Sequence, residues 1–222
     1  MTRLILAGGG DTSDSKPLDL LFIRSLKVKR VLYIPIAWKS GDFEACKKWF
    51  TATFSNLGFK NIEMWTDLHN KRFEDLKPFG GIYLGGGNTF SLLHDLRDSK
   101  FDKLLLKFIE SERPVYGGSA GAIILGKGIR TAGFGTDSDV NGVGLKDFSG
   151  LGLVNDFSIQ CHYEKSQDAQ LLRFSRSNAV IALSERCGLL VNNGVIKVVG
   201  FESAYLFQNG KKIEFKVGSK IT

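Results

Sequence analysis

The chain contains few of the residues that build metal centres and disulfide frameworks. Among its 222 residues it has three histidines and three cysteines, Cys46, Cys161 and Cys187. The cysteines show no paired C-x-x-C spacing, which argues against a structural zinc site and against a disulfide framework, and three reduced thiols fit a reducing compartment. No cluster of histidine, cysteine and acidic residues has the spacing of metal ligands, so we expect neither a metal nor another cofactor.

Long apolar runs are also missing. No run approaches the roughly 18 apolar residues of a membrane helix, and the run within residues 1–8 is too short for a signal peptide. The sequence therefore predicts a cytoplasmic protein that has no membrane as a partner.

Clustered basic charge is absent although the net charge is +7. The basic residues are scattered in ones and twos, as at Lys47 and Lys48, without an arginine-rich helix or a ladder of aromatic and basic residues. A nucleic-acid surface needs a continuous basic patch, so nucleic acid is not an expected partner.

Proline is scarce, and no segment has the composition of a linker. The chain has four prolines and no Pro/Ser-rich stretch, internal repeat or low-complexity tract. A chain of this length with 43% hydrophobic residues can bury one sizeable core. We expect residues 1–222 to form a single domain, as a monomer or a homodimer.

Apolar runs of strand length alternate with segments of helical period through the first two thirds of the chain. One segment places Phe43, Phe50 and Phe54 on one helical face, and a second, with Ser99 as its expected N-cap, does the same with Phe101 and Phe108. The strands are predicted at 3–8, 31–37, 61–66, 81–85 and 114–118. This alternation is typical of βαβ units around a mostly parallel sheet, so the predicted fold class is α/β.

The pattern changes after about residue 150 to strands separated by tight turns. The pairs Asn193-Gly194 and Asn209-Gly210 are strong signals for two-residue hairpin turns. We expect an α/β core that is extended by C-terminal β-hairpins.

The segment 114–125 predicts a strand, a sharp turn and the start of a helix. Within it, Gly117-Gly118-Ser119-Ala120-Gly121 matches the G-x-S-x-G nucleophile elbow. A nucleophile on a strained turn needs small neighbours, and the helix N-terminus behind it stabilises negative charge, so the N–H of Ala120 is a natural oxyanion donor. The alternative is a glycine-rich turn in which Ser119 is an ordinary N-cap.

A second glycine segment, Gly85-Gly86-Gly87, follows another predicted strand. Strand ends of an open α/β sheet converge on one crevice, so the N–H of Gly86 or Gly87 could supply a second oxyanion donor and Asn88 could bind substrate. The alternatives are a plain tight turn or a nucleotide site. The dinucleotide fingerprint G-x-G-x-x-G fails here, where Phe90 stands at the sixth position, and it fails again at Gly8-Gly9-Gly10.

A serine nucleophile needs a base, and the chain offers three histidines. His94 lies inside the helical segment 89–96 and His69 lies in a polar stretch, whereas His162 ends the predicted strand 157–162. His162 is therefore the predicted base. The acid that orients it is predicted at Glu185, which follows the strand 179–183, with two aspartates of a glycine-rich loop as rivals, Asp137 and Asp139.

These segments together resemble a known family. Tyr83–Phe90, then Gly118–Ala122, then a strand that ends in His162 are similar to the peptidase E family of serine peptidases, which includes aspartyl dipeptidases and the related cyanophycinases. The resemblance implies a three-layer α/β/α sandwich like that of class I glutamine amidotransferases, with serine replacing their elbow cysteine. It also implies that Ser119 is the nucleophile, His162 the base and Glu185 the orienting acid.

The sequence departs from the family at one position. Aspartyl dipeptidases of this family carry an arginine shortly after the catalytic histidine, where it pairs with the acidic side chain of the substrate, and this chain has Gln167 there. Lys165 or Arg173 could supply a cation from nearby. We expect a dipeptidase-like serine peptidase that cleaves small peptides without strict N-terminal aspartate specificity. An esterase or another amidase on the same site, or a non-catalytic α/β binding protein, are the alternatives.

Overall fold

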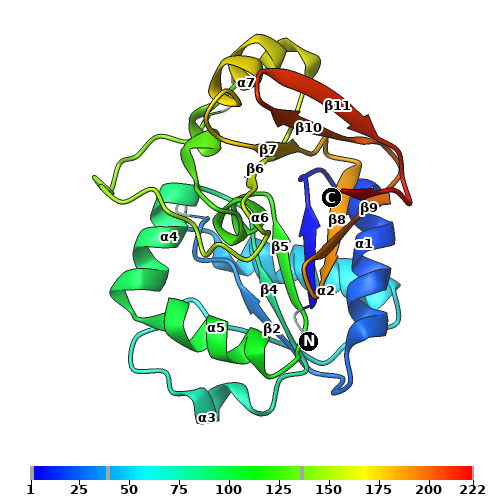
Figure 1. The fold of residues 1–222 in the computed structure, drawn as a ribbon. Helices are drawn as coiled ribbons and strands as arrows, with labels where there is room; N and C mark the ends of the chain where they lie inside the picture. The colour runs from blue at the N-terminus through cyan, green and yellow to red at the C-terminus, as the bar shows by residue number, and fades with distance from the viewer. Residues whose placement is uncertain (1–2, 39–40, 136–137, 222) are drawn as a thin grey trace.

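The computed structural model describes residues 3–38, 41–135 and 138–221, and Figure 1 shows their arrangement. In this part of the chain, a larger sheet has eight strands in the order β12-β9-β8-β1-β5-β4-β2-β3. Its parallel strands are β1 (Arg3–Ala7), β2 (Val31–Ile34), β3 (Ile62–Met64), β4 (Gly81–Leu84) and β5 (Val115–Gly118). The antiparallel strands that extend it are β8 (Cys187–Asn192), β9 (Val195–Gly200) and β12 (Lys220–Ile221).

Side chains of the parallel strands alternate between two buried faces. On β1, Leu4 and Leu6 belong to one apolar cluster, whereas Ile5 and Ala7 belong to another. The helices of the first cluster are α3 (Phe73–Leu76), α4 (Thr89–Asp98), α5 (Phe101–Glu110) and α6 (Ala120–Leu125). Those of the second are α1 (Thr12–Ser25) and α2 (Phe43–Asn56). Helices therefore cover both faces of the sheet (Figure 1), which confirms the predicted three-layer α/β architecture.

A smaller sheet lies beyond one end of the larger sheet, at the top of Figure 1. Its order is β11-β10-β7-β6, and β6 and β7 are parallel. The strands are β6 (Ser158–Gln160), β7 (Val180–Ala182), β10 (Ala204–Gln208) and β11 (Lys211–Phe215). Between β6 and β7 lie the short 3-10 helix η2 (Lys165–Gln167) and α7 (Asp168–Phe174), and another 3-10 helix, η1 (Arg130–Gly133), precedes β6.

Both predicted hairpins are present. Asn193 and Gly194 join β8 to β9 with φ values of 51° and 77°, and Asn209 and Gly210 join β10 to β11 with 53° and 71°. Two consecutive positive φ values define the type I′ turn, which asparagine followed by glycine favours.

Two local features differ from the sequence-based expectations. The segment that became α1 carried no prediction, and its start is explained by Asp11, whose side chain accepts hydrogen bonds from the N–H groups of Ser13 and Asp14. The N-cap position of α5 is Lys100 and not the predicted Ser99, whose hydroxyl donates to the Asp95 carbonyl at the end of α4 and accepts a 3.4 Å hydrogen bond from the Phe101 N–H, the first N–H group of α5. No helix in the described ranges is both long and apolar enough to span a membrane.

Candidate active site

Ser119 occupies the junction between β5 and α6. Its backbone has φ 49° and ψ −111°, a conformation that L-residues rarely adopt. The Ser119 N–H donates to the Ala7 carbonyl at 3.0 Å, and its carbonyl accepts from the N–H groups of Ala122 and Ile123 at 2.8 and 3.0 Å. The surrounding hydrogen bonds therefore hold the serine in the sharp turn of a nucleophile elbow.

The glycines of the elbow are required by close packing. A Cβ atom on Gly117 would lie 2.5 Å from the Gly121 carbonyl, and a Cβ on Gly121 would lie 2.5 Å from the Leu84 carbonyl. Both distances are shorter than any real Cβ contact, so only glycine lets α6 approach the strands this closely. The G-x-S-x-G match is thus part of the fold and not a chance pattern in a glycine-rich chain.

Three predicted catalytic side chains form one hydrogen-bonded row. Ser119 Oγ lies 2.7 Å from His162 Nε2, and His162 Nδ1 lies 2.9 Å from Glu185 Oε1. A carboxylate only accepts hydrogen bonds, so the proton shared with Glu185 belongs to Nδ1 and Nε2 is left to accept from the serine hydroxyl. The arrangement has the order nucleophile, base and orienting acid.

The three side chains come from different parts of the fold. Ser119 follows β5 of the larger sheet, His162 follows β6 of the smaller sheet, and Glu185 lies between β7 of the smaller sheet and β8 of the larger. The His162 N–H donates to the Gly8 carbonyl at 2.9 Å, which ties the end of β6 to the larger sheet. Contact between the two sheets therefore creates the row.

The first glycine loop, Gly8-Gly9-Gly10, contacts the base and the acid directly. A Cβ on Gly9 would lie 2.2 Å from His162 Cε1, and a Cβ on Gly10 would lie 3.0 Å from the Glu185 Cβ. Gly9 and Gly10 also have φ values of 128° and 79°, which glycine adopts without strain. Sequence reasoning missed this role, although three glycines at the end of a strand that pairs with the elbow strand were a usable signal.

The rival acid Asp139 is bonded elsewhere. Its Oδ2 accepts from the Thr89 N–H at 2.8 Å, at the N-terminus of α4, and its own N–H donates to the Ala132 carbonyl at 2.8 Å. The second rival, Asp137, lies outside the described residues. Of the predicted acids with a described position, Glu185 is the one bonded to His162.

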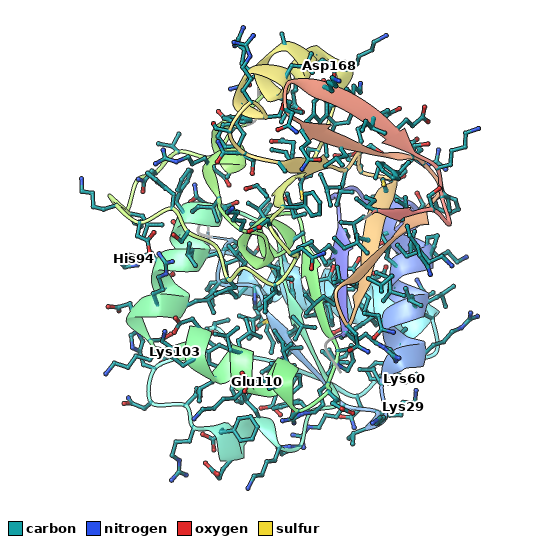
Figure 2. All side chains as sticks on the ribbon, viewed as in Figure 1. Lys29, Lys60, His94, Lys103, Glu110 and Asp168 are labelled. Carbon is teal, nitrogen blue, oxygen red and sulfur yellow. The ribbon has the colours of Figure 1, made fainter. Side chains whose placement is uncertain are left out.

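The remaining two histidines lie away from the elbow. His94 projects from α4 at the flank of the molecule (Figure 2), with its Nδ1 3.0 Å from Asp95 Oδ1. His69 is largely exposed, with its Nε2 3.9 Å from Asp98 Oδ2. Neither has a hydrogen bond to Ser119 within the described part of the chain.

The second glycine loop, Gly85-Gly86-Gly87, borders the nucleophile. A Cβ on Gly86 would lie 3.3 Å from the Ser119 Cβ and 3.9 Å from its Oγ. Among the described residues, no backbone carbonyl accepts from the N–H of Gly86 or Gly87. Ala120 is the first residue of α6, so its N–H has no acceptor within the helix. These groups are suited to hold an oxyanion beside Ser119.

The sequence profile of peptidase family S51 matches residues 4–199, a range that contains the whole Ser119–His162–Glu185 row. The chain belongs to peptidase family S51. The resemblance to peptidase E is thereby confirmed, and the protein is a serine-type peptidase.

Individual relatives agree with this membership. Peptidase E of Shewanella sp. (strain ANA-3) is 29% identical over 220 residues, which cover 91% of this chain and 89% of that protein. Peptidase E of Haemophilus influenzae is 27% identical over 84% of this chain and 88% of its own length. A solved structure from Listeria monocytogenes EGD-e, classed with peptidase E, has a TM-score of 0.72 at 26% identity and covers 91% of this chain and 100% of that one.

In this S51 peptidase, Asn88 has a structural role. Its Oδ1 accepts from the Ser91 N–H at 2.9 Å as the N-cap of α4, and its Nδ2 donates to the Val140 carbonyl at 2.9 Å. Both ends of the amide are thus bonded within the protein. Substrate binding by Asn88 stays a prediction.

Two cavities of different character reach Ser119 and His162. The first, here called the aromatic pocket, has a volume of about 440 Å³. Its largest lining side chains are Tyr33, Trp38, Trp49, Tyr83, Tyr116 and His162. The second, here called the polar cavity, has a volume of about 690 Å³. Its charged and amide side chains include Asp139, Glu164, Gln167, Glu185, Arg186 and Glu202.

Gln167 is buried at the wall of the polar cavity. Its Oε1 accepts from the Glu164 N–H at 3.2 Å, and a Cβ on Gly135 would lie 2.2 Å from its Nε2. Lys165 and Arg173, the two alternative cations, do not line this cavity in the described structure. Arg186 does, and its guanidinium lies 3.5 Å from Asp14 and 4.0 Å from Glu202.

Cys161, beside the base, is a poor candidate for a second nucleophile. Its Sγ lies 3.5 Å from the Ser119 carbonyl oxygen, and burial raises the pKa of the thiol well above its usual range. The thiolate is the reactive form of cysteine, so this side chain stays protonated and inert.

Proposed function

We propose that this serine peptidase hydrolyses the amide bond of dipeptides and similarly small peptides with a Ser119–His162–Glu185 triad, and that it does not require an N-terminal aspartate. The observation that carries the proposal is the row of two hydrogen bonds, 2.7 and 2.9 Å, that links the three side chains. Membership of family S51 supports peptide hydrolysis independently of this geometry.

The chemistry follows from the positions of the three groups. Ser119 Oγ attacks the carbonyl carbon while His162 Nε2 accepts its proton, and Glu185 stabilises the imidazolium that results. The N–H groups of Ala120 and of Gly86 or Gly87 hold the negative charge on the carbonyl oxygen. His162 then protonates the leaving amine, and water attacks the acyl-enzyme with His162 again acting as base.

The lack of aspartate preference follows from the charge of the polar cavity. The described residues that line it include the carboxylates of Asp139, Glu164 and Glu202, and its arginine already faces acidic partners. Selection of a free carboxylate needs a fixed cation, whereas Gln167 offers a neutral amide, whose hydrogen bonds are roughly half as strong. A substrate aspartate would face several like charges in this cavity.

The alternatives differ in their support. An esterase or another amidase would use the same triad, and a substrate panel separates these activities. A non-catalytic binding protein is not supported, because the chain belongs to a peptidase family. Cytoplasmic location, a single domain and a monomeric or dimeric state stay predictions.

The proposal is tested with a dipeptide panel of Asp-Leu, Ala-Leu, Val-Leu and Arg-Leu and with a fluorophosphonate probe. Ser119→Ala is expected to lower kcat by about 10³-fold or more and to abolish labelling. Ser111→Ala, at an exposed position after α5, is the matched control and should behave like the wild type.

Two results would contradict the proposal. If the Ser119→Ala protein keeps a kcat within about tenfold of the wild type, Ser119 is not the nucleophile. A kcat/KM for Asp-Leu more than about 100-fold above all other dipeptides removes the specificity claim.

A further inference from the structure

The aromatic pocket beside Ser119 has an apolar wall of aromatic rings that are held in place by stacking. Tyr33, Tyr83 and Tyr116 are buried at its base. The Tyr33 ring stacks on Phe50 with centroids 4.0 Å apart, and the Tyr83 ring stacks on Tyr116 at 4.2 Å. Rings held by stacking lose little freedom when a ligand binds, so the base of the pocket is preorganised.

The rim of the pocket exposes large apolar side chains. Trp38 is 47% exposed and Trp49 is 42% exposed, and both line the pocket. A pair of exposed tryptophans around a concave surface is typical of ligand-binding sites, because each ring gains contact area when the site is filled.

The two cavities that reach Ser119 differ in the charge of their described lining. The described lining of the aromatic pocket contains no aspartate, glutamate, lysine or arginine. The polar cavity, in contrast, carries the carboxylates Asp139, Glu164 and Glu202 besides the triad acid. In a dipeptide the α-ammonium belongs to the residue whose carbonyl is attacked, and this cation suits the acidic cavity. The second residue of the dipeptide then faces the aromatic pocket.

We propose that the aromatic pocket binds the side chain of the residue on the C-terminal side of the cleaved bond and selects apolar and aromatic side chains there. The proposal rests on the proposed function, and it adds the substrate class. A volume of about 440 Å³ lies near the lower end of the roughly 300–1,000 Å³ of small-molecule sites, which suits one side chain. The described lining contains no aspartate, glutamate, lysine or arginine that could pair with a buried ammonium or carboxylate.

The test measures kcat/KM for Ala-Phe, Ala-Leu, Ala-Ala, Ala-Glu and Ala-Lys. We expect Ala-Phe and Ala-Leu to exceed Ala-Glu and Ala-Lys by about 10- to 100-fold, the range that burial of one apolar side chain supports. Phe-Ala, with the aromatic residue on the other side of the bond, should not gain over Ala-Ala.

Variants at the pocket wall localise the effect. Ala45 lines the pocket from α2, so Ala45→Phe narrows it and should lower kcat/KM for Ala-Phe about tenfold or more while Ala-Ala changes less than about threefold. Ala52→Phe is the matched control, since Ala52 is an exposed alanine of the same helix outside the pocket. Trp49→Ala, at the half-exposed rim, should likewise weaken Ala-Phe more than Ala-Ala.

The outcomes distinguish this proposal from the proposed function. Fluorophosphonate labelling that persists, with equal cleavage of Ala-Phe and Ala-Glu, overturns the pocket proposal and leaves the triad intact. A preference for Phe-Ala over Ala-Phe also overturns it, because the pocket would then serve the N-terminal residue. Absence of labelling in the wild type overturns the proposed function, and the pocket proposal with it.

Discussion

Two glycine loops follow β1 and β4, the two strands of one sheet that flank the elbow strand β5, and their surroundings differ. Both consist of three consecutive glycines, Gly8–Gly10 after β1 and Gly85–Gly87 after β4. The first is filled by neighbours, since the His162 ring and the Ser184 carbonyl occupy the space where side chains would stand. In the second, a Cβ on Gly87 would lie 2.3 Å from the Ala37 carbonyl oxygen, and within the described ranges no backbone carbonyl accepts from the N–H of Gly86 or Gly87 beside Ser119. The same local sequence thus packs against His162 in one place and borders Ser119 in the other, which in the proposed mechanism are the base and the nucleophile.

The contrast shows that three consecutive glycines indicate a place where the backbone approaches its neighbours closely. They do not by themselves indicate a bound ligand. Each loop also resembles the start of a nucleotide-binding fingerprint, and the residues packed against each loop decide what it does. Substitutions in the two loops should therefore fail in different ways.

The largest effect is expected for Gly9→Ala. The added Cβ would lie 2.2 Å from the His162 ring, and the φ of 128° is strained for alanine, so the base must move. We expect kcat to fall by about 10³-fold, as in loss of a triad member. Gly58→Ala is the control, because its φ is 78° and its Cβ would meet open space, so only stability should change, by about 1 kcal/mol. Equal activity of the two variants would contradict the role of the first loop.

The acids beside the two loops sharpen the comparison. Glu185→Gln removes the charge that stabilises imidazolium, and we expect kcat to fall by about 10²-fold, less than for a buried acid because Glu185 is 53% exposed. Asp139→Asn keeps an acceptor for the Thr89 N–H at the second loop and should change kcat less than about threefold. If steady-state kinetics show the larger loss for Asp139→Asn, the acid of the triad is reassigned.

A smaller effect is expected for Gly86→Ala. Its N–H remains, and the added Cβ would sit 3.3 Å from the Ser119 Cβ, a crowded but adjustable contact. We expect kcat/KM to fall about tenfold with an unchanged melting temperature. A loss as large as that of Gly9→Ala would show that the second loop also positions a catalytic side chain.

The helices that follow the loops differ as well, and here activity should not change. α1 buries Asp19, whose Oδ2 accepts from the Ser15 hydroxyl at 2.9 Å, whereas α4 buries no charged residue. Burial raises the pKa of Asp19 from 3.8 to about 6. The folded state therefore binds the proton more tightly than the unfolded state, so the stability from this group is full below pH 4 and falls as the pH rises to about 6.

The measurement is urea unfolding at pH 4.5 and pH 7. Titration of Asp19 is expected to lower the free energy of unfolding of the wild type by about 2–3 kcal/mol as the pH rises. Asp19→Asn should remove this part of the pH dependence. Asp156→Asn, at a side chain 91% exposed, should leave it unchanged. If the free energy of unfolding changes between pH 4.5 and pH 7 as much in the Asp19→Asn protein as in the wild type, the assignment to Asp19 is wrong.

Sequence reasoning succeeded where local geometry follows from a short segment, as in the strand, turn and helix around Ser119 and in the two Asn-Gly turns. His162 was selected among three histidines by its place at a strand end, and its ring lies 2.7 Å from the Ser119 hydroxyl, whereas its role as the base stays a prediction. The alternation of apolar segments likewise predicted an α/β fold with a mostly parallel sheet, and the family resemblance implied its three layers.

The rest depended on contacts between distant segments. Nothing near Gly9 in the sequence shows that a histidine ring 153 positions later will pack on it, and the strand pairing that forms the smaller sheet joins β6 and β7 to a hairpin after residue 200. The helix α1 was missed because Pro17 and several polar residues obscure its apolar face. The aromatic pocket combines side chains from β2, α2, β4 and β5, and their meeting place follows only from strand order.

The row of catalytic side chains spans two sheets, and this has a consequence during synthesis of the chain. When the ribosome has completed β5 and α6, the nascent chain carries Ser119 but not yet His162 or Glu185. In the proposed mechanism the serine is then an unactivated alcohol, because the proposed base follows β6 and the proposed orienting acid follows β7. In the proposed mechanism, peptide hydrolysis therefore begins only after synthesis has passed Glu185 and β6 and β7 have docked, so a product that ends before Glu185 is inactive.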